Sequence, residues 1–190
     1  MTPTNIAGSA STVRRNVLIL AICQALSMSG ASLVMTVSAL AGQMVATDKS
    51  LATVPLAMQF TATMLSTIPA SLLMGRIGRR AGFTIGQILG LLGAGLACWA
   101  LFLGDFWLFV GGSSIIGVHN AFWQYYRFAA ADTAGQEFKA RAISYVLAGG
   151  VIAALLGPQL SKWSVDLFSP VLFAGGYLAI IALSFVTIFL

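Results

Sequence analysis

An arginine-rich stretch between two long apolar runs places the strongest constraint on the fold of this chain. Residues 75–80 read Gly-Arg-Ile-Gly-Arg-Arg, and the uncharged runs on either side, residues 51–74 and 81–104, are each 24 residues long. About 20 apolar residues suffice for a helix to cross a bilayer, whereas arginine is costly inside hydrocarbon. The stretch is therefore predicted to be a turn between two membrane helices, with its arginines facing the cytoplasm.

The composition supports a location in the bilayer. Hydrophobic residues make up 58% of the chain and charged residues only 8%, whereas about a quarter of the residues of a soluble domain are charged. The net charge is +5, but the basic residues flank the apolar runs instead of forming one basic face, so no nucleic-acid partner is expected. The prediction is an all-α integral membrane protein surrounded by lipid, with no cofactor.

The uncharged runs predict six transmembrane helices. They are expected at residues 16–47, 51–74, 81–104, 106–126, 142–161 and 167–190. Residues 1–13 are small and polar and predict a disordered cytoplasmic tail, which leaves residues 14–190 as the six-helix bundle. Eight of the ten Lys and Arg residues then fall on the side of the arginine turn, and only Lys49 and Lys162 fall on the other. Both termini are therefore predicted to be cytoplasmic, in a bacterial inner membrane.

The arginine turn resembles the signature loop of the major facilitator superfamily of transporters. Residues 71–80, Ser-Leu-Leu-Met-Gly-Arg-Ile-Gly-Arg-Arg, are similar to the pattern G-x-L-x-D-R-x-G-R-R between helices two and three of that family. Ser71 replaces the first glycine of the pattern, and Gly75 replaces its acid. The resemblance implies a conformational latch formed by Arg76, Gly78, Arg79 and Arg80.

A second likeness lies in the predicted fifth helix. There Gly149, Gly157 and Pro158 resemble part of the glycine-rich Gly-Pro motif of the antiporter branch, and this likeness implies that they pack closely against a neighbouring helix. An arginine that the family has early in helix four is absent, because Gly111-Gly112-Ser113 occupy that region.

The resemblance implies a fold and a partner. The chain corresponds to the first six of the family's twelve helices, arranged as two inverted three-helix repeats, with the first and fourth helices lining a central cavity. A second six-helix half is then required. It is either a copy of this chain, a separate chain, or the C-terminal half of a longer protein of which this chain is a fragment.

Polar side chains inside the apolar runs mark the expected substrate site. Such groups are wasteful against lipid, so they are predicted to face a small-molecule substrate, or alternatively to hydrogen-bond neighbouring helices. Arg127, near the inner end, either attracts an anionic substrate or extends to the headgroups. The predicted set comprises His119, Asn120, Trp123, Gln124, Arg127, Gln24, Ser27 and Ser32.

The sequence is compatible with two classes of function and argues against a third. The first is half of a secondary active or facilitative transporter for a small solute that works by alternating access; if protons drive it, His119 is the titratable group in mid-membrane. The second is a transporter-derived scaffold that binds another membrane protein and moves nothing. An enzyme is not expected, because Ser113 and Ser114 lack a G-x-S-x-G context, and the chain has one His and only loop carboxylates, so no metal site is predicted either.

Overall fold

The structure is a computed structural model that describes residues 3–134 and 138–190, with side chains from residue 11 onward. Within these residues the chain forms helices and no strand, so the all-α prediction is confirmed for this part. The helices are α1 (Pro3–Val45), the short 3₁₀ helix η1 (Lys49–Leu51), α2 (Val54–Ile77), α3 (Arg79–Leu103), α4 (Phe106–Trp123), α5 (Tyr126–Thr133), α6 (Lys139–Ser164) and α7 (Ala174–Phe189).

Four segments of the described chain are helical, long and apolar enough to cross a membrane. They are Ser11–Val45, Lys49–Ile77, Arg79–Leu103 and Lys139–Ser164. The other two predicted spans are shorter: α4 has 18 residues, of which His119 and Asn120 are strongly polar, and α7 has 16. The chain therefore has the helices of an integral membrane protein, whereas six spans stay a prediction.

The last predicted span is shorter than expected. Residues 167–190 were expected to form one helix, but turns occupy the chain up to Phe173, and α7 begins at Ala174. Pro170 explains much of the difference, because proline lacks a backbone N–H and disfavours helical geometry in the residue before it. Phe173 also has a positive φ of 68°, which cannot continue a helix.

The fourth predicted span is broken. A helix over residues 106–126 was expected, but α4 ends at Trp123, and a second helix, α5, begins at Tyr126 and continues into the predicted inner loop as far as Thr133. The tyrosines at this break are held by different helices: Tyr125 Oη donates to the Thr67 carbonyl of α2 at 2.9 Å, and Tyr126 Oη accepts from Gln87 of α3 at 2.9 Å.

The first helix also differs from its expected start. α1 begins at Pro3, so residues 3–13 continue the first predicted span as one helix instead of an irregular tail. The division into a tail and a bundle at residue 14 does not coincide with a helix end, and it stays a prediction.

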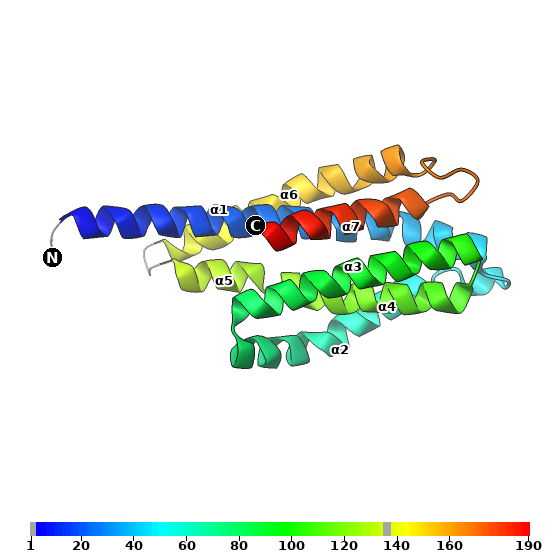
Figure 1. Cartoon of the computed structure of the whole chain (residues 1–190), viewed down its shortest axis with the longest axis horizontal. Helices are drawn as coiled ribbons and strands as arrows, with labels where there is room; N and C mark the ends of the chain where they lie inside the picture. Colours follow the sequence, from blue (N-terminus) through cyan, green and yellow to red (C-terminus); the bar gives the residue numbers. More distant parts are fainter. Residues whose placement is uncertain (1–2, 135–137) are drawn as a thin grey trace.

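The helices form one elongated bundle with their long axes roughly side by side (Figure 1). The most extensive contacts join α1 to α6, α3 to α4, α2 to α4 and α3 to α7. The α2–α3 turn and the end of α7 lie toward the end of the bundle from which α1 extends (Figure 1). The arginine turn and both ends of the described chain therefore lie toward the same end of the bundle, and their side of the membrane stays a prediction.

Glycines allow these helices to approach closely. On α3, a Cβ added to Gly90 would lie 2.9 Å from His119 Nδ1 of α4, and Gly86, one turn earlier, faces Phe122. On α6, a Cβ at Gly149 would lie 2.6 Å from the Ala21 carbonyl oxygen of α1. Small residues at these positions allow backbone-to-backbone packing without a hydrophobic driving force between helices.

Candidate functional site

A cavity of about 490 Å³ lies between α1, the α4–α5 break and α6. Its volume falls within the range of about 300–1,000 Å³ that is typical of small-molecule sites. Four of the eight predicted site residues line it, and its remaining walls are mainly apolar residues of α6. These four are Gln24, Trp123, Gln124 and Arg127.

The side chains of this cavity combine an aromatic face with hydrogen-bonding groups. Trp123 Nε1 donates to Asn120 Oδ1 at 3.0 Å, which holds the indole ring at the end of α4. Gln24 Nε2 donates a weak hydrogen bond to Met28 Sδ at 3.9 Å, and Gln24 Oε1 is buried with no hydrogen-bond partner within the described residues. The Arg127 guanidinium lies over the Phe128 ring, 4.9 Å from its centroid, and the residue is exposed. Such a set can orient a flat polar solute.

His119 and Asn120 do not share this cavity. His119 is 3% exposed, and its Nδ1 lies 2.8 Å from the Gly86 carbonyl oxygen of α3. Both side chains instead line a void of about 10 Å³ between α1, α4 and α7, about the size of one water molecule. The geometry therefore favours the alternative in which His119 bonds a neighbouring helix, and its role in substrate binding is not supported by its position.

Ser27 and Ser32 also lie at contacts between helices. Ser32 lies where α1 packs on α6, since a Cβ at Gly157 would lie 2.5 Å from Ser32 Cβ. Ser27 Oγ accepts a hydrogen bond from Gln87 Nε2 at 2.9 Å. Pro158 follows Gly157 within α6, so the three residues of the Gly-Pro motif belong to the helix that packs on α1.

Gln87 is a residue that the predicted site missed. Its amide donates to Ser27 Oγ and to Tyr126 Oη, each at 2.9 Å, and joins α3 to α1 and α5 inside the bundle. It is 2% exposed. The signal was present in the sequence, because Gln87 is the only carboxamide in the uncharged run 81–104.

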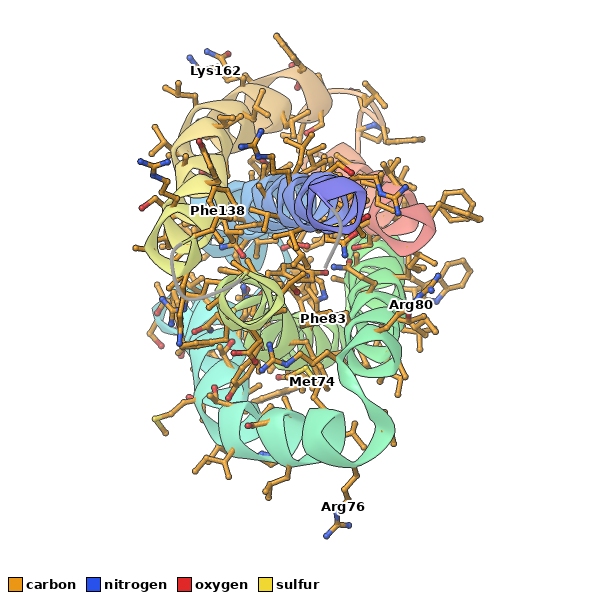
Figure 2. All side chains as sticks on the ribbon, turned by 90° about the vertical axis from the view of Figure 1, so that its left-hand side faces the viewer. Met74, Arg76, Arg80, Phe83, Phe138 and Lys162 are labelled. Atoms are coloured by element: carbon orange, nitrogen blue, oxygen red, sulfur yellow. The ribbon has the colours of Figure 1, made fainter. Side chains whose placement is uncertain are left out.

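The arginine turn forms one ion pair within the described chain. Arg79 at the start of α3 pairs with Asp132 of α5, and both side chains line a second cavity, of about 540 Å³, that contains Gln87 and Tyr126 deeper in the bundle. Gly78 has a φ of 88°, which favours glycine at the junction of α2 and α3. Viewed toward this end of the bundle, Arg76 and Arg80 extend outward (Figure 2). Only Arg79 of the predicted latch thus bridges to another helix in this conformation.

Removing this ion pair is expected to change stability little. The side chains of Arg79 and Asp132 are 43% and 59% exposed, and exposed pairs contribute roughly 0–1 kcal/mol. Replacing Asp132→Asn should therefore lower the Tm in detergent by less than about 4 °C, measured by tryptophan fluorescence, with Arg76→Gln as the control on the same turn. A much larger loss would show that the pair holds the bundle together instead of acting as a weak contact.

The described residues include no group of three or more His, Cys, Asp or Glu side chains that could hold a metal ion. The groups that the cavity offers are therefore those of a binding site: an aromatic ring, two carboxamides and a guanidinium.

Comparison with known proteins points to transport. No protein-family model matches the chain. Over 170 residues the chain is 38% identical to the riboflavin transporter RfnT of Brucella anthropi. The aligned region covers 90% of this chain but 43% of that transporter. The chain thus spans less than half the length of this relative, and it is similar along most of its own length to one part of a riboflavin transporter.

Proposed function

We propose that this chain is a six-helix half of a small-solute transporter of the major facilitator type, which works by alternating access together with a second six-helix unit. The observation that carries the proposal is its 38% identity to a riboflavin transporter over 90% of its length. The membrane-capable helices and the cavity lined by Gln24, Trp123 and Arg127 agree with it.

The pattern of helix contacts supports two inverted repeats. In this proposal α4 with α5 is the fourth span, α6 is the fifth and α7 is the sixth. The inverted repeat then places α4 in the position of α1, α6 in that of α2, and α7 in that of α3. The extensive contact of α1 with α6 then corresponds to that of α4 with α2, and the contact of α3 with α4 corresponds to that of α7 with α1. All four contacts are present, and the contact of α3 with α7 maps onto itself.

Among the four candidate spans, those of α2 and α6, which the repeat exchanges with each other, are the least buried. In the most apolar part of each candidate span, only 17% of the α2 residues and 28% of the α6 residues are buried, against 44% for α1 and 50% for α3. These two helices flank the cavity face in the proposed arrangement. A second half packed against α2 and α6 would enclose the cavity between the two halves.

The side chains of the cavity suit a flat heteroaromatic substrate, and we infer riboflavin or a close analogue. The isoalloxazine ring of riboflavin combines a broad aromatic face with ring carbonyl and N–H groups along one edge. Trp123 offers a stacking surface, and the carboxamides of Gln24 and Gln124 both donate and accept hydrogen bonds. The guanidinium of Arg127 adds donors for a carbonyl or hydroxyl group.

Uptake of labelled riboflavin tests the proposal directly. Riboflavin-requiring cells would express the chain alone, a second copy in tandem, or the chain joined to the part of RfnT that it does not match. We expect uptake above the vector control from at least one of these forms, with unlabelled riboflavin competing. If all three forms insert into the membrane and none transports riboflavin, the substrate assignment is wrong; if they also fail with other small solutes, the scaffold function is favoured instead.

A further inference from the structure

We propose that the groove between α1 and α6 binds an anionic phospholipid of the leaflet at the arginine-rich end of the bundle. The groove encloses about 610 Å³ and has Arg14 on one helix and Arg141 on the other. Most of its remaining lining is apolar or aromatic. The inference requires only that α1 and α6 lie in a bilayer, so it does not depend on the transport activity.

The groove has about the depth of one leaflet. Its α1 wall runs from Arg14 at the charged end to Ala25, about 16 Å along a helix that rises about 1.5 Å per residue, and the apolar lining from Val17 to Ala25 covers about 12 Å of it. Half of the hydrocarbon core of a bilayer is about 15 Å. Leu18 and Ile22 on α1 and Ile152 on α6 line the groove and are exposed, so these walls would otherwise face lipid or another chain.

The charged end of the groove suits a phosphodiester. Arg14 and Arg141 line it from opposite helices, and guanidinium groups bind phosphate oxygens in a bidentate geometry. No acidic residue is among the described residues that line the groove. Tyr145, which is exposed beside Arg141, has the amphipathic side chain that is common at the headgroup level.

Other cavities of the chain match this chemistry less well. The 540 Å³ cavity also contains two arginines, but Arg79 there is already paired with Asp132. The candidate substrate cavity contains one arginine and shares no lining residue with the groove. The groove alone, among the cavities of the described chain discussed above, combines arginines on two facing helices with an apolar wall of leaflet depth.

Native mass spectrometry of the purified protein tests this inference, with phosphatidylglycerol and phosphatidylcholine added in parallel. We expect one phosphatidylglycerol to bind more tightly than phosphatidylcholine. Each of Arg14→Gln and Arg141→Gln should weaken phosphatidylglycerol binding about fivefold, because a basic residue near the surface contributes about 1 kcal/mol. Arg15→Gln, which removes a neighbouring exposed arginine outside the groove, should leave binding unchanged.

Two further variants separate a bound lipid from general attraction to the surface. Ala148→Trp fills the apolar part of the groove without changing an arginine and should also weaken binding at least fivefold, whereas Leu155→Trp, on the exposed face of α6, should not. Arg14→Lys with Arg141→Lys keeps the charge and should retain preference for phosphatidylglycerol. Glycerol 3-phosphate, which lacks acyl chains, should not compete. Equal binding of both lipids, or no effect of Ala148→Trp, would overturn the inference.

Discussion

Riboflavin uptake is expected to fall at least about tenfold when Trp123 is replaced by alanine. The indole lines the candidate cavity and is held at the end of α4 by its hydrogen bond to Asn120. Its loss removes the stacking surface for a heteroaromatic ring, and a tenfold effect corresponds to about 1.4 kcal/mol of binding free energy. The measurement is the initial rate of uptake at subsaturating riboflavin by whichever form of the protein transports it.

Control substitutions separate loss of the site from loss of the fold. Trp99 and Trp163 are 61% and 71% exposed, and neither lines the candidate cavity, so their replacement by alanine should leave uptake within about twofold. Trp123 also packs against the hydrophobic cluster that includes Val17 and Tyr126, so Trp123→Ala is expected to lower the Tm, and its uptake is compared with the wild type at matched levels of folded protein in the membrane. Normal uptake by a folded Trp123→Ala variant would move the substrate site elsewhere. His119→Ala should also lower the Tm, because it removes a buried hydrogen bond to Gly86.

Replacing Gly117 with valine is expected to destabilise the fold strongly. A Cβ at this position would clash with the Gln59 backbone of α2 and lie 2.9 Å from Ala62 Cβ. The helices are also joined here by a hydrogen bond of 2.9 Å from Thr63 Oγ1 to the Gly117 carbonyl. Because backbone cannot move aside as a flexible side chain can, we expect a loss of about 3 kcal/mol and a fall in Tm of about 6 °C or more.

The matched control lies on the same helix. A Cβ added at Gly111 of α4 would lie in open space, with no atom of a neighbouring residue within 4 Å. Gly111→Val carries the same change in helix propensity and should retain most of the stability. Thermal unfolding in detergent, followed by tryptophan fluorescence, compares the two variants. Equal stability of both would show that α2 and α4 do not approach each other as closely as this arrangement requires.

The distribution of charge made the helices predictable from the sequence. Arginines and aspartates interrupt the apolar runs, and α2 and α3 lie close to the expected spans. The predicted turn at residues 75–80 is shorter than expected, because α2 continues to Ile77 and α3 begins at Arg79, so only Gly78 lies outside both helices. The predicted start of the last span at residue 167 was wrong, because α7 begins at Ala174, although Pro170 in the sequence indicated an interruption of the helix. The break after Trp123 had no such signal, and the tyrosines that follow it bond to Thr67 and Gln87, which are far from it in the sequence.

The sequence indicated which types of residue to consider for the candidate site, but not the direction in which each side chain points. Polarity singled out side chains inside the apolar runs, yet it cannot distinguish a cavity from a helix interface or from an exposed position such as that of Arg127. His119 points toward α3 because Gly86 and Gly90 leave room for it, and this depends on how two helices cross. Trp123, only four residues later, lines the cavity together with Gln24. Their role in substrate binding stays a prediction.

The break between α4 and α5 has a mechanical consequence. Trp123 and Gln124 sit at a joint whose far side, Tyr126, is tied through Gln87 to two other helices. Tyr126 begins α5 and Asp132 lies near its end, and their partners Gln87 and Arg79 both belong to α3. This short helix is therefore fixed to α3 at both of its ends, by a buried hydrogen bond at one and an exposed ion pair at the other.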